Sequence, residues 1–363
     1  MKKTRILFFT PSFSRGGSEI YLYNLLKNLD TTKFEIFLYS DSKGELTKEL
    51  LPFPFFAINQ KQTLVHIILR KLFKYSYKER KILKIHKSFK SDIWFVNTSV
   101  LPQITNLAQK KGIDYLVLFH ELESVHDTIV GDDFINMIQK AKSIVTCSLS
   151  VKRMVNLVRT KNIYVQNGHV NFIKTTKQSV FRNKYNIPKE AFVWVMSGQK
   201  NYRKGYDMVP EIASFLQKTN SYLIWLGGNR TYGINKLVDA GSYPNLIEPG
   251  LLKNSEYQAV LATANAFVLT AREDPFPLVM IEAASIGLPI ISFNSGGVSE
   301  FVEDGMGKVI DSCNVKELCR TMQELMNGKI NIDRQKTIEK AKKFDIKIKV
   351  KEWEELLEKI INE

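Results

Sequence analysis

Cysteine is scarce in this sequence of 363 residues, which contains Cys147, Cys313 and Cys319. The three thiols are odd in number, lie far apart and form no CxxC pair. Neither a disulfide framework nor a zinc site is therefore indicated, and buried structural thiols are the expectation.

Long apolar runs are also missing. The run near the start, within MKKTRILFFTPSFSRGG, lasts only about six residues before Pro11, which favours a first buried strand over a signal peptide. No stretch approaches the roughly 20 apolar residues that a membrane-spanning helix needs. We therefore expect a cytoplasmic protein, whose contact with the inner face of the cell membrane would be peripheral.

Acidic residues are outnumbered, and the net charge is +15. The excess is uneven: residues 61–90 contain ten Lys or Arg against one acid, Glu79. Apolar residues alternate with these bases, as in a helix that lies on an anionic membrane surface. The alternative is a solvated basic face of a helix packed on its domain by its apolar side. Nucleic acid is not expected as a partner, because no recognition motif accompanies the charge.

The chain length predicts two domains, because 363 residues is long for one hydrophobic core. Short apolar runs alternate with helical candidates, which predicts an α/β fold with parallel sheets. The expected strands of the first domain are residues 5–10, 34–40, 92–97, 115–120, 143–148 and 162–166. A polar and basic stretch from 171 to about 190 is expected to be the hinge.

The segment Arg272–Glu300 contains most of the chemistry. Asp274 and Glu282 stand eight residues apart, and a helix is expected from Leu278. Carboxylates can bind hydroxyls, and the amides and dipole of a helix N-terminus attract phosphate, so the pattern suits a nucleotide sugar. The alternative is that Asp274 only caps the helix and that Glu282 is a surface residue.

Glycines and bases follow two further predicted strands. Gly16 and Gly17 come after the first strand, in a turn suited to phosphate, although Ser18 could simply cap the next helix. Gly198 ends a strand of the second domain, and Arg203 and Lys204 follow it where a diphosphate could lie.

His120 falls at the carboxyl end of a predicted strand, where parallel sheets bind ligands. Glu121, Glu123 and His126 follow it, but their spacing matches no strong metal motif.

The order acid, FPLV, EA, GLP, SGG and SE in Arg272–Glu300 resembles the donor-site signature of retaining glycosyltransferases of family 4, which have the two-domain GT-B fold. The family pattern is Glu, seven residues, Glu. Here the first acid is Asp274, or Glu273 one step out of register. The resemblance implies two Rossmann-like doubly wound domains, at 1–172 and 173–345, that face each other across a cleft. It also implies that the helix at 346–363 crosses back onto the first domain.

The resemblance further implies a role for each candidate residue. Glu282 would hold the ribose, Asp274 and the following amides the sugar, and His120 would make a polar contact to sugar and acceptor. Lys204 matches a Lys-Gly motif, and Arg203 would replace an Arg that many members have where this chain has Gln199. The implied catalytic residues are His120, Arg203, Lys204, Asp274 and Glu282. The implied donor-binding residues are Gly16, Gly17, Gly198, Gly250, Leu251, Phe276, Pro277, Leu278, Val279 and Glu282.

The activity implied by the resemblance is transfer of a sugar, with retention, from a nucleoside diphosphate-sugar to a hydroxyl of a saccharide or lipid-linked saccharide. Cell-surface polysaccharide or glycolipid synthesis is the expected setting, with neither cofactor nor metal. Two alternatives stay open at the level of the sequence: a nucleotide-sugar epimerase of the same architecture, and a non-catalytic protein that binds sugar or nucleic acid.

Overall fold

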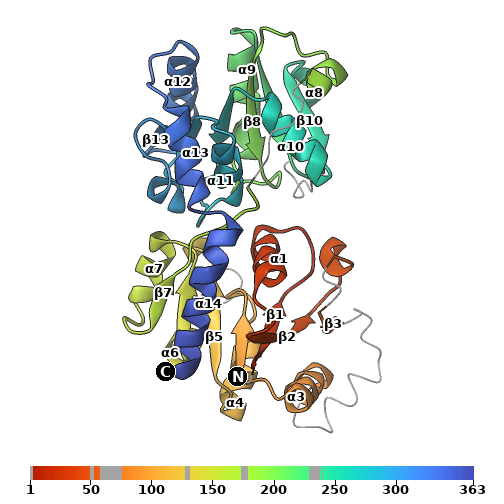
Figure 1. Ribbon diagram of the computed structural model, residues 1–363. Helices are drawn as coiled ribbons and strands as arrows, with labels where there is room; N and C mark the ends of the chain where they lie inside the picture. The colour runs from red at the N-terminus through yellow and green to blue at the C-terminus, as the bar shows by residue number, and fades with distance from the viewer. Residues whose placement is uncertain are drawn as a thin grey trace. The chain divides into compact units, whose positions relative to one another are not determined.

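The computed structural model describes residues 3–49, 53–57, 76–126, 131–172, 179–228, 238 and 240–363. It divides into two compact units, each built on one sheet (Figure 1). Unit 1 comprises Met1–Gly168 with Ile346–Glu363, and unit 2 comprises His169–Asp345. The sequence placed the first boundary slightly later, after residue 172.

The sheet of unit 1 has seven parallel strands in the order β3-β2-β1-β4-β5-β6-β7. The strands are β1 (Thr4–Thr10), β2 (Phe34–Ser40), β3 (Phe55–Ala57), β4 (Ile93–Val96), β5 (Tyr115–Phe119), β6 (Ser143–Thr146) and β7 (Ile163–Val165). Strands covered on both faces read as continuous apolar runs. In β1, Ile6, Leu7, Phe8 and Phe9 are all fully buried, so the short apolar run near the start is a core strand.

Helices cover both faces of this sheet. They are α1 (Gly17–Asn28), α3 (Tyr77–Phe89), α4 (Pro102–Lys111), α5 (Glu123–Val125), α6 (Asp133–Lys140), α7 (Leu149–Asn156) and α14 (Ile346–Asn362). The last of them, blue in Figure 1, lies beside α1 among elements from the start of the chain. The buried Trp353 donates its indole N–H to the Tyr21 hydroxyl at 2.9 Å, which joins the two helices within the core.

Unit 2 has six parallel strands in the order β10-β9-β8-β11-β12-β13. They are β8 (Phe192–Ser197), β9 (Ser221–Leu226), β10 (Leu246–Gly250), β11 (Ala266–Leu269), β12 (Ile290–Phe293) and β13 (Gly307–Ile310). Its helices are α8 (Ser179–Lys184), α9 (Val209–Gln217), α10 (Asn254–Thr263), α11 (Leu278–Ser285), α12 (Val315–Met326) and α13 (Arg334–Lys342). Because α8 falls inside 171–190, that stretch is not purely a hinge, as the sequence had suggested.

Each sheet reverses its strand order once. In unit 1 the reversal lies between β1 and β4, and in unit 2 it lies between β8 and β11. Parallel sheets bind ligands beyond the carboxyl ends of the strands at such a point. The loop after β8 begins at Gly198, and the loop after β11 contains Asp274. Both loops therefore start at the position where a doubly wound unit holds its ligand.

The basic segment at 61–90 is described from Ser76 onward; residues 61–75, where most of its apolar residues lie, fall outside the described residues. Helix α3 begins with a capping box between Ser76 and Glu79 and buries Ile82. Among the residues that the structure describes, no helix combines the length and apolar character needed to cross a membrane.

Candidate functional site

In unit 2, the loops that follow β8 and β11 are joined by three hydrogen bonds that backbone carbonyls accept. The Arg272 amide donates to the Arg203 carbonyl at 2.8 Å, and Arg203 Nη1 donates to the Glu273 carbonyl at 2.9 Å. The Thr270 hydroxyl donates to the Lys204 carbonyl at 2.7 Å. These bonds join residues about 70 positions apart in sequence, so the two loops form one framework.

Gly205 permits this close approach. Its φ is +72°, in the left-handed region that favours glycine, and an added Cβ would lie 2.2 Å from the Thr270 carbonyl oxygen. Any larger residue would push the loop that contains Arg203 and Lys204 away from β11.

Lys204 and Asp274 form an ion pair across the framework, with side-chain exposures of 15% and 8%. The backbone of Asp274 is also fixed, because its amide donates to Ser295 at 2.7 Å and its carbonyl accepts from Gly297 at 3.2 Å. The N-cap of α11 is Pro277, which has no side-chain cap. The interpretation of Asp274 as a simple helix cap is therefore wrong: its carboxylate points to a cation of the neighbouring loop.

Arg272 adds a second clamp to the same framework. Its guanidinium makes a two-pronged contact to the Asp207 carboxylate, with both N–O distances 2.7 Å. It also donates to the Tyr202 carbonyl at 2.6 Å and stacks on the Tyr202 ring, 3.7 Å from the centroid. A planar guanidinium suits both contacts, which hold the loop on either side of Arg203 and Lys204.

Glu282 lies on α11, and the Tyr257 hydroxyl of α10 donates to its Oε2 at 2.6 Å. Burial raises the pKa of Glu282 to about 7, and the hydrogen bond from Tyr257 opposes that rise. A small part of the residue surface remains accessible. Glu282 is therefore a largely buried carboxyl rather than the surface residue of the alternative interpretation, and it changes charge near neutral pH.

The predicted donor-binding residues around the start of α11 differ in what they offer. The Phe276 ring is buried against Phe301 and Phe344, so its side chain belongs to the core. Leu278 and Val279 open the helix, where amides have no partner within the helix itself. At this terminus the free backbone amides can donate to a ligand.

Gly198 lies against the stem of Lys204, since an added Cβ would be 3.4 Å from Lys204 Cδ. Gln199, which stands where the resemblance leads us to expect Arg, is exposed. The next residue, Lys200, is buried and pairs with Glu248 at 3.1 Å, and the Tyr206 hydroxyl donates to the same carboxylate at 2.5 Å. A buried cation at Lys200 thus lies one position beyond the missing Arg.

Gly250 ends β10 with a φ of +78°, and Leu251 follows it with 69% of its surface exposed. The Leu251 side chain lies beside Gly228, where an added Cβ would meet Leu251 Cγ at 3.0 Å. Leu251 belongs to the segment Pro249–Leu252, which the family resemblance implies lies against the nucleobase, and this contact stays a prediction.

In unit 1, His120 stands at the end of β5 and is partly exposed. Its Nε2 lies 3.4 Å from Asn97 Oδ1, and Asn97 Nδ2 donates to the Ser18 carbonyl at 3.0 Å. The Tyr21 ring packs edge-on against the imidazole, with centroids 4.9 Å apart. Contacts from α1 and from the end of β4 therefore fix the orientation of His120.

The buried carboxylate of Glu121 stabilises the turn that follows His120. Its carboxylate accepts hydrogen bonds from the Ser99 hydroxyl at 2.7 Å, from the His120 amide at 3.0 Å and from the Thr98 hydroxyl. Burial raises its pKa, against these bonds. His126 Nε2 contacts the Ser99 hydroxyl at 2.8 Å. Across the described ranges, no group of three or more His, Cys, Asp or Glu side chains is arranged to hold a metal ion.

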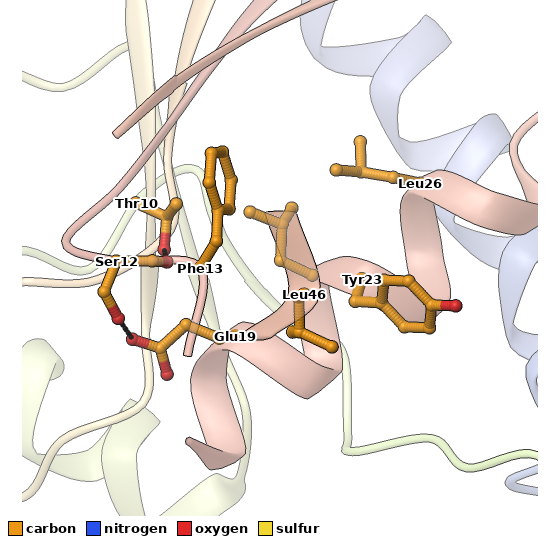
Figure 2. Close-up of a pocket in the computed structure, with 8 residues that line it drawn as sticks. Thr10, Ser12, Phe13, Glu19, Tyr23, Leu26 and Leu46 are labelled. Atoms are coloured by element: carbon orange, nitrogen blue, oxygen red, sulfur yellow. Dashed lines mark hydrogen bonds between the residues drawn. The ribbon is translucent and has the colours of Figure 1, made fainter. Parts of the chain in front are cut away.

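The glycine turn of unit 1 leads into a helix whose first turn contains a carboxylate. Gly16, rather than Ser18, is the N-cap of α1, and Glu19 in the first turn accepts from Ser12 at 2.9 Å and from Ser18 at 3.0 Å. Figure 2 shows Glu19 reaching Ser12 at the edge of a cavity of about 10 Å³, enough for about one water molecule. Because a carboxylate lies at this helix start, the contact of Gly16 and Gly17 with donor phosphates stays a prediction.

Sequence reasoning missed several residues that shape these sites. Tyr257, Lys200 and Asp207 have partners at distant positions, and no local pattern marks them. Asn97 did have a signal, because it lies at the end of a predicted strand, whereas Glu121 was named beside His120 but only as a possible metal ligand.

Comparison with known proteins bears on the family of unit 2 and on the fold of the chain. Residues 177–344 match the family model described as glycosyl transferases group 1. The chain is 28% identical over 134 residues, 36% of its length, to the Vi polysaccharide biosynthesis protein VipC/TviE of Salmonella typhi. It is 29% identical over 116 residues, 30% of its length, to the alpha-galactosylglucosyldiacylglycerol synthase of Streptococcus pneumoniae. These alignments span only 23% and 30% of the two relatives.

Solved structures are similar over nearly the whole chain. HepE of Anabaena, solved with UDP and glucose, has a TM-score of 0.83 at 16% identity, over 98% of this chain and 99% of the other. Sucrose-phosphate synthase of Thermosynechococcus elongatus has a TM-score of 0.80 at 14% identity, over 99% and 100%. The predicted GT-B fold, with two Rossmann-like units, is thereby confirmed. With the family model and the motif in Arg272–Glu300 in agreement, unit 2 belongs to the glycosyl transferases group 1, family 4 of the glycosyltransferases.

Proposed function

We propose that this protein is a retaining glycosyltransferase that moves a sugar from a nucleoside diphosphate-sugar to a hydroxyl of a saccharide or lipid-linked saccharide, in the synthesis of a cell-surface polysaccharide or glycolipid. The observation that carries the proposal is the pairing of Lys204 with Asp274 on two joined loops at the switch point of unit 2. A cation and a carboxylate at one strand edge suit a ligand that is anionic at one end and rich in hydroxyls at the other.

Each candidate site residue of unit 2 has a role in this proposal. Lys204 and Arg203 offset the charge that grows on the leaving diphosphate as the bond from the sugar C1 to phosphate oxygen breaks. Glu282 accepts hydrogen bonds from the ribose hydroxyls. Asp274, once Lys204 turns to the phosphate, accepts hydrogen bonds from the sugar hydroxyls, and the first amides of α11 donate to the sugar oxygens. In the free protein, Lys204 and Asp274 therefore neutralise each other, and binding of the donor separates them.

In the reaction, the acceptor oxygen forms a new bond to C1, and the bonding electrons of the old bond stay with the phosphate oxygen. The acceptor proton passes to that oxygen, so attack occurs on the face that the diphosphate leaves and the configuration is retained. His120 contributes a polar contact to sugar and acceptor from unit 1. A covalent double displacement is the other route to retention.

The first experiment measures which nucleotides bind. Thermal melting is recorded with UDP, ADP, GDP, CDP and TDP and with matching nucleotide sugars, because a ligand that binds the native state raises the melting temperature. We expect one nucleoside diphosphate to raise it by several degrees at millimolar concentration, on the order given by mass action. UDP is the first choice, since the HepE structures contain UDP or UDP-glucose. A panel without any shift would contradict the proposal.

The second measurement separates transfer from epimerisation. Release of nucleoside diphosphate is followed from the preferred nucleotide sugar with and without a panel of saccharide acceptors. A glycosyltransferase releases the nucleotide faster when an acceptor is present. An epimerase would convert the donor alone, and a binding protein would release no nucleotide above the spontaneous rate.

The membrane contact of α3 is part of the proposal, since a lipid-linked acceptor lies at a surface. Lys78 pairs with Asp41 at 2.5 Å and Lys81 packs over Phe56, whereas Lys84, Lys87 and Lys90 are exposed. Each lysine near an anionic leaflet contributes about 1 kcal/mol. Replacing the last three by Gln is expected to weaken co-sedimentation with phosphatidylglycerol vesicles at low salt by more than tenfold.

The control for this prediction changes the same charge elsewhere. Lys253, Lys316 and Lys329 are exposed lysines of unit 2, and their replacement by Gln should leave sedimentation with vesicles unchanged. If both triple variants sediment like the wild type, α3 is only a solvated face of unit 1.

A further inference from the structure

The Tyr257 hydroxyl joins two helices of unit 2 at the carboxylate of Glu282. It donates to Glu282 Oε2 at 2.6 Å, from α10 to α11, across 25 positions of sequence. The side chain of Ser197, the last residue of β8, also acts on this hydroxyl and lowers the Tyr257 pKa. The loop that follows β8 contains Gly198 and Lys204.

This contact fixes the orientation of the carboxylate. An ionised carboxylate has about four positions that accept hydrogen bonds, and Tyr257 takes one of them on Oε2. The remaining positions suit two neighbouring hydroxyls, such as the 2′ and 3′ hydroxyls of a ribose. Without the Tyr257 bond, rotation about the last side-chain torsion of Glu282 would spread these positions over several directions.

We propose that Tyr257 is a positioning residue for Glu282, which it holds in the orientation that binds the vicinal diol of a ribonucleotide donor. This rests on the proposed function, because it assumes that unit 2 holds a nucleoside diphosphate. Tyr257 acts only through Glu282 and has no part in breaking or forming bonds.

The charges around the pair agree with this role. Burial raises the Tyr257 pKa well above its usual value, and the charge on Glu282 raises it further, so the phenol stays a donor at every physiological pH. Burial raises the pKa of Glu282, and the Tyr257 bond lowers it, so Tyr257 favours the ionised carboxylate. The cations near the two ends of α11 have other partners. Arg334 of α13 donates to the Ile286 carbonyl at the end of α11, and Lys204 pairs with Asp274 before the start of α11.

The test compares two ligands on the full chain. Wild type, Tyr257→Phe and Ser197→Ala are titrated with UDP, ADP and GDP and with the 2′,3′-dideoxy form of each, by calorimetry. A hydrogen bond to a charged group contributes about 1.5–3 kcal/mol, so Tyr257→Phe is expected to weaken the best ribonucleotide by about 10- to 100-fold. Its affinity for the dideoxy form should equal that of the wild type. Ser197→Ala should act in the same direction with a smaller loss.

Binding as a function of pH gives a second readout. In the wild type, affinity for the ribonucleotide should rise as Glu282 ionises near pH 7. Loss of the Tyr257 hydroxyl removes a contact that lowers this pKa, so the midpoint should move to higher pH in Tyr257→Phe. Tyr115→Phe is the matched control, because it removes a buried hydroxyl of unit 1 that bonds to Gln109 and the Met137 carbonyl. That variant should keep the wild-type affinities and midpoint.

The outcomes are distinguishable. Equal losses for the ribose and dideoxy forms would mean that Tyr257 supports only the packing of α10, and the inference would be overturned. Unchanged affinity for both forms would overturn it as well. If the wild type binds no nucleoside diphosphate, the proposed function itself fails, and the inference fails with it.

Discussion

Lys204→Ala is expected to lower the rate of nucleoside diphosphate release by about 10²–10³-fold, the loss typical of removing one group that stabilises charge in a transition state. In the structure the Lys204 ammonium is paired with Asp274 and largely shielded from water. A cation in such surroundings interacts more strongly with a developing diphosphate charge than it would in bulk water. The measurement is the initial rate of release from the preferred nucleotide sugar with a saturating acceptor.

The same variant also leaves the Asp274 carboxylate without its partner. Breaking a buried pair from one side destabilises a protein by about 3–5 kcal/mol, so a low rate could reflect unfolding alone. The double variant Lys204→Ala with Asp274→Asn removes both charges together, and its melting temperature should recover most of the loss. Its activity should stay as low as that of Lys204→Ala.

This comparison decides what the lysine does. If the double variant regained the activity of Asp274→Asn, Lys204 would serve only to neutralise Asp274, and its assignment to the diphosphate would be wrong. Lys316→Ala changes an exposed lysine of α12 and should retain the wild-type rate and melting temperature.

The sequence predicted where the chemistry lies because strand ends are readable from local patterns. Buried runs such as Ile6–Phe9 mark core strands, and parallel strands bring their carboxyl ends to one edge of the sheet. Gly198 and His120 were found in this way, whereas Asp274 was singled out by its spacing from Glu282 before a predicted helix. The ion pair of Lys204 with Asp274, which are 70 residues apart, was not predicted from the sequence.

The partners of these residues could not be predicted, because they depend on packing between elements. Tyr257 reaches Glu282 only because of the angle and register between α10 and α11, which no spacing within one helix encodes. The interpretation of Asp274 as a helix cap failed for a related reason. A helix capped by Asp274 would begin at Pro275, but α11 begins three positions later, at Leu278, after the two prolines around Phe276. Likewise, Glu19 at the start of α1 is visible in the sequence, but its contact with Ser12 is not.

Glu282→Gln is expected to separate function from stability. The ribonucleotide loses a charged acceptor for its hydroxyls, so turnover should fall by at least tenfold. At alkaline pH the free energy of unfolding of Glu282→Gln should be higher than that of the wild type. The wild type must then keep a charged carboxylate in a largely buried position. Natural sites often have this property, in which a group that binds a ligand destabilises the free protein.

The sign of the pH dependence follows from the raised pKa. Glu282 titrates near 7 in the folded protein and near its ordinary value of 4.5 when unfolded, so the folded state holds more protons between these values. The free energy of unfolding of the wild type therefore falls, through this group, as the pH rises from 4.5 to 7. The full shift corresponds to about 3 kcal/mol at 1.36 kcal/mol per pKa unit, and partial exposure reduces the expected gain of Glu282→Gln to about 1–2 kcal/mol.

Urea denaturation of both proteins at pH 5 and pH 8, without nucleotide, checks this result. We expect Glu282→Gln to be more stable than the wild type at pH 8, with a smaller difference at pH 5, where the wild-type carboxyl is protonated. Glu317→Gln, which replaces a carboxylate that accepts from the Ser312 hydroxyl near the start of α12, serves as the control and should show no gain at pH 8. The contradicting result is a wild type that is as stable as Glu282→Gln at pH 8, or more stable. It would mean that contacts in unit 2 compensate the buried charge of Glu282 even without a ligand. The ribose-binding carboxylate would then not lower the stability of the free protein.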